Sequence, residues 1–503
     1  MNLVAALDRV VDADPTGVAL HADGRAWTRS ALRDAIDAMA ARLSLDHAVA
    51  RGARVGYLGP NRAEQLVLLF ALARLGAVFV PLNTRLAAAE LATIVRHAEL
   101  QALVADAGHR DVADAVLAAV RRAGDERPVA LALAALAADT PRRATIDAAP
   151  DPATPVLLVY TSGTTAAPKG AVHTHAGLLA NAAAAIAAHA MTADDRVLTA
   201  LPLFHVGGLC IQTVPALLAG ATVLLHPRFD ADAWLDTMRD ARPTLTLMVP
   251  ATLRAVIGHP RWHATDLSCL RVLMTGSSVV PRALIDAVHA RGVPVGQVYG
   301  STETGPVTVA LGAADARRKA GRAGWPCFAG SVRLVDADGA DVADGAVGEI
   351  VVRAPNLMRG YWKEAPGAGF RDGWFATGDF GRVEADGCLE VVGRARDLII
   401  TGGENVYPAE IEDVLLAIDG VAEAAVVGVA DERWGEVPVA FVVRDGRVAL
   451  DESDVAAAFV DRIARFKHPK RIVFVPALPR NAMGKVQPHL LPHPKTEDGP
   501  PVA

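Results

Sequence analysis

Cysteine is scarce in this chain of 503 residues. The only four, Cys210, Cys269, Cys327 and Cys388, stand far apart. Structural zinc sites and disulfide frameworks need regularly spaced cysteines, so neither is expected. Free thiols in a large chain fit a reducing compartment, and we predict a cytoplasmic protein.

An excess of basic residues and a long uncharged apolar run are missing as well. The chain has 50 Lys and Arg against 56 Asp and Glu, so its charge does not favour nucleic acid as a partner. Asp8 breaks the short N-terminal apolar stretch, which is therefore unlike a signal peptide. Arg74 interrupts Leu66 to Leu82, which fits a buried helix and strand better than a membrane span. We expect no stable membrane insertion, and a monomer or homodimer.

What the chain does contain is an alternation of helical and strand patterns. Apolar residues make up 52% and charged residues 21%, as in globular proteins, and the length predicts at least two domains. A helix is expected over Ala63 to Leu75, a strand over Ala77 to Leu82, and a helix, strand and helix over Ala88 to Val120. This order predicts a large α/β domain with layered, largely parallel sheets.

The pattern changes after about Gly330. Short β-type runs between Asp/Gly turns predict a small β subdomain at the end of the large domain. A charged break at Arg394 to Leu398 follows. Beyond it, a helix (Pro408 to Ala417), two strands and a helix (Asp451 to Ala464) predict a smaller α+β domain.

The clearest chemical motif is YTSGTTAAPKG, from Tyr160 to Gly170. An apolar strand leads into a loop of small hydroxyl residues and glycine, closed by a lysine. Backbone N–H groups can approach a polyphosphate closely in such a loop, hydroxyls add donors, and Lys169 adds positive charge. The loop is not a Walker A motif. Taken alone, it could also be a flexible turn.

This loop resembles the signature of the adenylate-forming superfamily, which includes acyl-CoA synthetases, luciferases and peptide-synthetase adenylation domains. The resemblance extends over almost the whole chain, and is strongest to fatty-acyl-CoA, feruloyl-CoA and coumarate-CoA ligases. It implies that the loop holds the β- and γ-phosphates of ATP through Thr161, Ser162, Gly163, Thr164, Thr165 and Lys169. One departure is Ala166, where the family usually has glycine.

Further motifs follow in the family's order. Gly276-Ser277-Ser278 resembles the loop that runs along adenine. Tyr299-Gly300-Ser301-Thr302-Glu303 resembles the motif in which the tyrosine stacks near adenine, the threonine touches the α-phosphate and the glutamate coordinates Mg²⁺. A carboxylate is a ligand that this hard cation prefers. A plain turn and a surface acid are the alternatives.

The remaining matches concern ribose, the hinge and coenzyme A. The resemblance assigns Asp379 to the ribose hydroxyls and Arg394 to ribose or phosphate. It divides the chain into an acyl-adenylating domain (1–393), a hinge (394–397) and a mobile C-terminal domain (398–503). The hinge residue is Arg396, where the family usually has Asp or Lys. Gly402 and Gly403 match the glycines beside the pantetheine arm, where a side chain would obstruct passage.

Two more residues complete the expected catalytic set. Lys485, in PRNAMGK, resembles the lysine that bridges the incoming carboxylate and the α-phosphate. His205, in LPLFHVGGL, matches the mouth of the acyl pocket, where packing, gating or a catalytic role are all open. The implied cofactors are ATP, Mg²⁺ and coenzyme A, and the implied substrate is a carboxylic acid. Acyl transfer through an adenylate needs no protein nucleophile, and the sequence offers no such constellation.

The acid itself is less clearly indicated. No acidic residue follows Phe204, which disfavours amino acids, and Val298 stands where malonyl-CoA synthetases have arginine. The lining expected from Val206, Gly207, Val298 and Thr304 is small and mostly apolar. We predict a medium- or long-chain fatty acid, with a hydroxycinnamate as the alternative. A ligase that loads a carrier protein and a non-catalytic binding module stay open, although Glu303 and Lys485 argue against the module.

Overall fold

Two large sheets form the framework of the chain. The computed structural model describes residues 1–137, 150–161, 169–276, 280–394, 397–401, 404–431, 433–460, 462–481 and 485–492. Nine strands form one sheet, in the spatial order β15 (Trp325–Pro326), β14 (Val309–Leu311), β13 (Val295–Tyr299), β12 (Val272–Thr275), β11 (Leu245–Met248), β9 (Arg196–Thr199), β10 (Thr222–Leu225), β1 (Val18–Ala22) and β2 (Arg25–Thr28). Seven form the other, in the order β18 (Gly360–Tyr361), β8 (Lys169–Thr174), β7 (Pro155–Thr161), β4 (Val78–Pro81), β3 (Arg54–Leu58), β5 (Ala102–Ala105) and β6 (Val129–Ala132).

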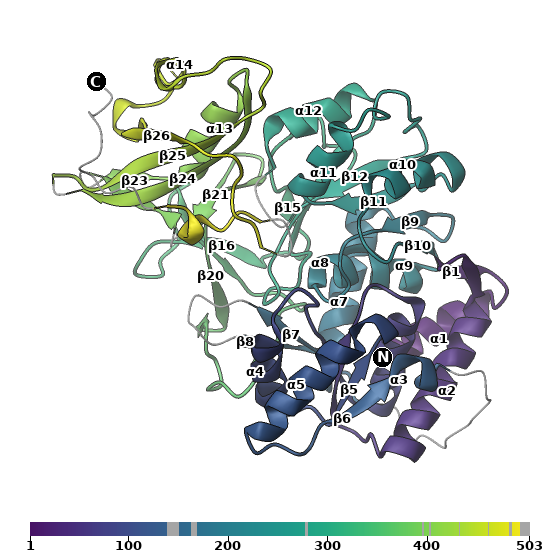
Figure 1. Cartoon of the computed structure of the whole chain (residues 1–503). Helices are drawn as coiled ribbons and strands as arrows, with labels where there is room; N and C mark the ends of the chain where they lie inside the picture. The colour runs from purple at the N-terminus through teal and green to yellow at the C-terminus, as the bar shows by residue number, and fades with distance from the viewer. Residues whose placement is uncertain are drawn as a thin grey trace.

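Helices lie between the two sheets and outside them (Figure 1). The inner helices share one core cluster with strands of both sheets; they are α1 (Leu3–Ala13), α2 (Arg29–His47), α3 (Ala63–Leu75), α7 (His175–His189) and α9 (Val214–Ala219). The outer helices pack on one sheet each; they are α4 (Ala88–Ala98) and α5 (Arg110–Arg122), and α10 (Ala231–Asp240), α11 (Pro250–Ile257) and α12 (Arg282–Ala290). Interior strands such as β4 and β5 are buried throughout, which is why their sequences are continuously apolar.

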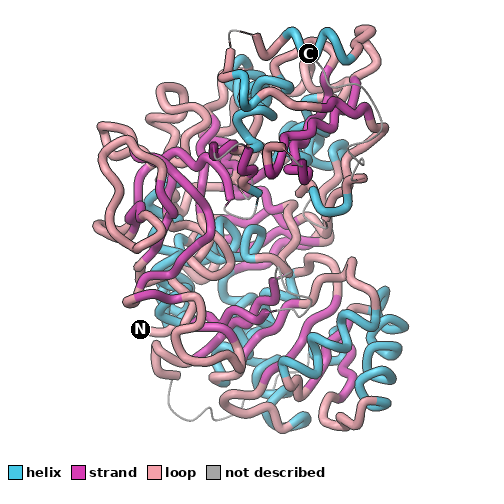
Figure 2. Tube along the Cα trace, turned by 90° about the vertical axis from the view of Figure 1, so that its left-hand side faces the viewer, coloured by secondary structure: helices cyan, strands magenta, loops and turns pink. Residues whose placement is uncertain are grey.

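The smaller sheets follow in the chain. The third sheet contains β16 (Val332–Val335), β17 (Gly348–Val352), β19 (Phe370–Arg371), β20 (Trp374–Val383) and β21 (Leu389–Arg394). The C-terminal unit contains β22 (Ile399–Thr401), β23 (Glu404–Val406), β24 (Val421–Asp431), β25 (Gly435–Arg444) and β26 (Arg471–Phe474), with α13 (Pro408–Leu416) and α14 (Glu452–Ala457). The predicted fold class is therefore confirmed, and Figure 2 shows helices alternating with strands through the large domain.

The predicted helix over Ala63–Leu75 has its predicted bounds, whereas the last predicted helix is too long. The helix Ala63–Leu75 ends where Gly76 adopts φ 69°, a left-handed conformation that glycine accepts without steric cost. The helix predicted to reach Ala464 is wrong in its length, because α14 ends at Ala457. Beyond it the backbone forms i→i+3 turns, from Ala458 to Val455 and from Phe459 to Ala456. These turns let Phe459 reach the core, where it is fully buried.

The C-terminal unit docks on the large domain through a charged contact at α11. A guanidinium nitrogen of Arg254 donates to the backbone oxygen of Ala422, at the start of β24. Its Nε lies 3.8 Å from Glu423, which also pairs with Arg480 at 2.8 Å. Glu423 thus lies between an arginine of the large domain and Arg480 of the C-terminal unit, and it connects the two units.

Candidate active site

Three predicted residues meet at the junction of the nine-stranded sheet and the third sheet. Tyr299 ends β13, and its hydroxyl donates to Oδ2 of Asp379 at 2.9 Å. Arg394 pairs with Oδ1 of the same carboxylate at 2.7 Å through its Nε. The antiparallel register of β20 and β21 sets Asp379 opposite Arg394. Three motifs far apart in the sequence therefore share one carboxylate.

This carboxylate is enclosed and ready to accept further donors. Asp379 is 5% exposed. Burial, and then the nearby Asp379, raise the pKa of Tyr299 well above its ordinary value, so the phenol stays a neutral donor. Each carboxylate oxygen has two lone pairs, and both oxygens of Asp379 can accept hydrogen bonds from a vicinal diol in addition to Tyr299 and Arg394.

A second group of residues lies around Glu303. The hydroxyl of Tyr361 donates to Oε1 of Glu303 at 3.0 Å, and Nζ of Lys169 lies 5.3 Å from the centre of the Tyr361 ring. Strand β18, which contains Tyr361, pairs with β8, which begins at Lys169. Tyr361 was not predicted as a site residue. It is distant in sequence from both partners, and no spacing pattern indicates that β18 joins this sheet.

The turn that presents Glu303 is held by its own hydroxyls. The backbone N–H of Ser301 donates to Thr304 Oγ1 at 2.8 Å, and Ser301 Oγ accepts from the N–H groups of Glu303 and Thr304, both at 3.2 Å. Thr302 is 6% exposed. A Cβ on Gly300 would lie 2.5 Å from the oxygen of Gly305. Glycine is required there because two backbone segments of the turn touch.

The predicted acid side is apolar and tightly packed. Val206 is 3% and Val298 is 6% exposed, and both belong to the main core cluster. A Cβ on Gly276 would lie 2.6 Å from the oxygen of Val298, so the expected adenine loop and pocket wall touch. Gly207 is buried in the short helix α8 (Val206–Gly208) and donates its N–H to His205 Nδ1 at 3.4 Å.

His205 is partly exposed to solvent, and the protein surrounds the rest of its side chain. Burial lowers its pKa to about 4, so the ring is neutral near pH 7. A neutral imidazole that caps a helix fits packing or gating better than proton donation. The catalytic role for His205 stays a prediction.

Two buried amides on the acid side were missed by the sequence reasoning. Asn181 donates from Nδ2 to the oxygen of Cys210 at 2.7 Å and accepts from the N–H of Val307 at 3.1 Å. These two bonds join α7 to the segments that contain Cys210 and Val307. Gln212, on a π-helical turn (Leu209–Thr213), is 2% exposed, and both of its amide atoms lack a hydrogen-bond partner among the described residues. A polar residue within the apolar run Leu209 to Val214 was the available signal.

Several predicted residues fall outside the part of the chain that the structure describes. These are Ser162, Gly163, Thr164, Thr165, Ser277, Ser278, Arg396, Gly402 and Gly403. Thr161 is described and pairs with Lys169 where β7 meets β8. The backbone N–H of Lys485 donates to Asn481 Oδ1 at 3.0 Å, next to a bridge between Arg480 and Val486. The roles of these residues stay predictions.

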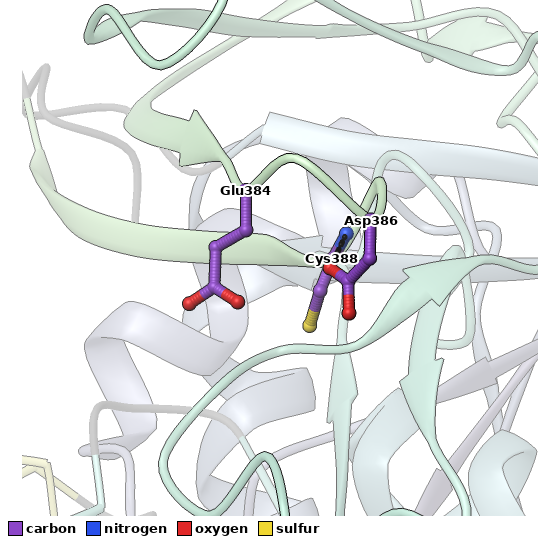
Figure 3. A group of neighbouring side chains, drawn as sticks. All are labelled: Glu384, Asp386 and Cys388. Carbon is purple, nitrogen blue, oxygen red and sulfur yellow. Dashed lines mark hydrogen bonds between the residues drawn. The ribbon is translucent and has the colours of Figure 1, made fainter.

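A group that resembles a metal site lies on the turn between β20 and β21. Figure 3 shows Glu384, Asp386 and Cys388 side by side. Lys319 Nζ lies 2.5 Å from Glu384 and 2.7 Å from Asp386, and Arg322 also pairs with Glu384. The hydrogen bond from Lys319 is the main cause that lowers the pKa of Asp386 to about 2. Cations of the protein already neutralise these carboxylates, so we interpret the group as an ion-pair network.

Comparison with known proteins identifies the class. Two family models match, the AMP-binding enzyme over residues 7–362 and the AMP-binding enzyme C-terminal domain over residues 410–485. The chain therefore belongs to the AMP-binding, adenylate-forming family, as the sequence predicted. It is an AMP-forming acyl-CoA ligase that uses ATP, Mg²⁺ and coenzyme A.

Individual relatives are similar over nearly the whole chain. The indoleacetate–CoA ligase of Aromatoleum aromaticum is 47% identical over 498 residues, 97% of each chain. The feruloyl-CoA synthase of an Amycolatopsis species is 41% identical, covering 86% of this chain and 87% of its own. The solved O-succinylbenzoate coenzyme A synthetase of Bacillus subtilis, in complex with ATP and magnesium ion, is 31% identical with a TM-score of 0.85, covering 97% of this chain and 98% of its own. Among the described residues, no helix is long and apolar enough to cross a membrane.

Proposed function

We propose that the chain activates an aromatic carboxylic acid of the arylacetate type and transfers the acyl group to coenzyme A. The observation that carries this choice is the 47% identity to an indoleacetate–CoA ligase over 97% of both chains. The second relative acts on ferulate by its name, which is also an aromatic acid. The apolar wall of Val206 and Val298 suits a flat ring.

The preference for a fatty acid that the sequence favoured stays a prediction. A small apolar lining is compatible with an alkyl chain, but it does not distinguish an alkyl chain from a ring. The indoleacetate and feruloyl ligases are both named for aromatic acids. We therefore place the aromatic acid first. Coenzyme A as acceptor, rather than a carrier protein, is consistent with the same names.

In the first reaction, a carboxylate oxygen attacks the α-phosphorus of ATP and pyrophosphate leaves. We assign Asp379, with Tyr299 and Arg394, to the ribose, because an enclosed carboxylate can accept hydrogen bonds from both hydroxyls. Lys169 neutralises charge on the outer phosphates, and Thr302 donates to the α-phosphate. Lys485 bridges the two anions, whose repulsion is the main barrier to their meeting.

The residues present suit a magnesium ion. Glu303 offers a carboxylate at the phosphate end, and hard oxygen ligands are those that Mg²⁺ takes in proteins, together with phosphate oxygens. Bound there, the ion would supply positive charge that neutralises the departing pyrophosphate. In this assignment Glu303 binds the ion, and Tyr361 holds one carboxylate oxygen in place.

In the second reaction, the thiol sulfur of coenzyme A attacks the acyl carbonyl carbon, AMP leaves, and the thiol proton goes to solvent or phosphate. Lys485 and the Gly402–Gly403 pair belong to the same small domain but serve different reactions. We propose that this domain, residues 398–503, rotates about a hinge at 394–397 between them. We also propose a cytoplasmic location and a monomer or homodimer.

The test is a substrate panel with the purified chain, ATP and Mg²⁺, in the presence and absence of coenzyme A. The panel contains indoleacetate, phenylacetate, ferulate, coumarate, benzoate, octanoate, palmitate and malonate, and an acyl carrier protein replaces coenzyme A in a parallel series. We expect the highest kcat/KM with an arylacetate, and acyl-CoA as product. A higher value with palmitate or octanoate would return the fatty acid to first place, and transfer only to the carrier protein would overturn the acceptor.

A further inference from the structure

The segment around Tyr361 is fixed to the strand that begins at Lys169. The backbone N–H of Arg359 donates to the oxygen of Val172 at 2.8 Å, and that of Trp362 donates to Gly170 at 2.7 Å. The register places Tyr361 opposite Ala171. The Tyr361 ring therefore stands in a set position beside the lysine that closes the phosphate loop.

The same segment holds Glu303 at two points. The backbone N–H of Met358 donates to the backbone oxygen of Glu303 at 2.8 Å, and the Tyr361 hydroxyl donates to the carboxylate at 3.0 Å. Burial, and then the charge of Glu303, raise the pKa of Tyr361, so the hydroxyl keeps its proton. One short segment, from Met358 to Tyr361, thus fixes both the backbone and the side chain of the proposed metal ligand.

Tyr361 also keeps two opposite charges apart. The ammonium of Lys169 lies over the ring face, 5.3 Å from its centre, in the range of a cation–π contact. The carboxylate of Glu303 is held at the hydroxyl end of the same ring. No ion pair joins Lys169 to Glu303 in the described part of the chain, although both reach the same tyrosine. A direct pair would neutralise the two groups and reduce their attraction for phosphate and for a cation.

We propose that Tyr361 is a positioning residue of the phosphate end of the site: its hydroxyl orients Glu303 for the metal that accompanies ATP, and its ring holds Lys169 away from that carboxylate for phosphate. This inference rests on the proposed roles of Glu303 and Lys169. Tyr361 itself touches neither substrate nor metal in this scheme.

The test compares Tyr361→Phe, which keeps the ring and removes the hydroxyl, with Tyr361→Leu, which removes both. Binding of ATP and of AMP is measured by calorimetry without acid, over a series of Mg²⁺ concentrations. We expect Tyr361→Phe to raise the Mg²⁺ concentration needed for half-maximal ATP binding about tenfold, the effect of one hydrogen bond to a charged group. Tyr361→Leu should weaken ATP further. AMP should bind both variants as it binds the parent chain, because its ribose end is intact.

Tyr57→Phe is the matched control, since it also removes a buried tyrosine hydroxyl bond, to the oxygen of Pro60 at 2.9 Å, away from the site. Unchanged Mg²⁺ dependence in Tyr361→Phe would overturn the inference, and an equal loss of ATP and AMP binding would reduce Tyr361 to a structural role. The same titration with Glu303→Gln distinguishes a failure of the role inferred for Tyr361 from a failure of the role proposed for Glu303. If it shifts the Mg²⁺ dependence and Tyr361→Phe does not, only this inference fails. If neither shifts it, the proposed role of Glu303 fails as well.

Discussion

On the proposed nucleotide side of the site, the carboxylate of Asp379 is held by contacts within the protein, with Tyr299 and Arg394. In the segment that follows Val206 and Gly207 on the proposed acid side, the buried amide of Gln212 has no hydrogen-bond partner among the described residues, and its sequence neighbours Cys210 and Ile211 belong to the main core cluster. In the proposed role, the first set is preorganised for the nucleotide, which every turnover requires. The second leaves a polar group whose partner the acid could supply. Preorganised polar groups favour rate and affinity, whereas unsatisfied ones favour selection between substrates.

The largest effect should come from Lys485, because in its proposed role it contacts both the nucleotide and the acid. Replacing Lys485 by Ala removes a positive charge that acts mainly in the transition state, and we expect adenylation to fall roughly 10²-fold or more. Acid-dependent pyrophosphate exchange measures this step. Lys467→Ala is the control, because it removes a lysine of the same domain that pairs with Glu410 at 2.5 Å. Similar rates for the two variants would refute the role of Lys485.

The next effect tests the preorganised side directly. In Asp379→Asn, the carboxylate that Tyr299 and Arg394 share becomes a neutral amide with one acceptor oxygen, which can no longer accept from four donors. Hydrogen bonds to charged groups contribute about 1.5–3 kcal/mol, so the affinity for AMP should fall roughly 10- to 100-fold. Calorimetry with AMP measures it. Asp386→Asn, on the exposed turn of the same sheet, should bind AMP normally; equal affinities in both variants would contradict the assignment.

A backbone change should affect the turn that presents Glu303. The Cβ of Gly300→Ala would lie 2.5 Å from the oxygen of Gly305, and relief requires the backbone to move. We expect a loss of about 1–3 kcal/mol in unfolding free energy and a higher KM for ATP. Gly108→Ala, whose Cβ would meet an ordinary contact of 3.5 Å, is the control in denaturant titrations. A stable Gly300→Ala with normal KM would show that the turn tolerates the shift.

Replacement of Gln212 should change the unfolding free energy less than replacement of Gly300, and in the opposite direction. Gln212→Met keeps a similar shape and removes a buried amide without a partner in the described structure, so the unfolding free energy should stay constant or rise by about 1 kcal/mol. If the amide selects the acid, KM for the preferred acid should rise several-fold while AMP affinity stays constant. Unchanged KM across the substrate panel would exclude Gln212 from acid selection.

The smallest effect on activity should come from pH. Burial lowers the pKa of His205 on the acid side and of His173 on the phosphate side to about 4, so neither ring titrates between pH 6 and 9. A lowered histidine pKa stabilises the fold above the unfolded pKa of about 6.5, and this contribution is lost as pH falls from there toward 4. We expect thermal unfolding temperatures to be level above pH 7 and to fall below pH 6. A rise on acidification would reverse the sign and contradict the buried, neutral state.

Motif spacing placed three distant residues in one predicted site, and their role at the nucleotide stays a prediction. Tyr299, Asp379 and Arg394 were assigned to one ligand from their motifs, and the structure brings them together. Helix α3 has the bounds that periodicity predicted. The predicted length of α14 was wrong, because a local pattern could not show that the chain turns after Ala457 and buries Phe459 in the core.

The sequence by itself determined the family, through short motifs that each have a single chemical demand, and the layered α/β class, through the alternation of helical and strand patterns. It also predicted which residues surround ATP. Only the tertiary structure decided that Tyr361 stands between Lys169 and Glu303, and that Arg254 and Arg480 share Glu423. These contacts join segments far apart in the chain through sheet pairing and domain docking. Such pairings depend on how the whole core packs, and no local pattern of residues encodes them.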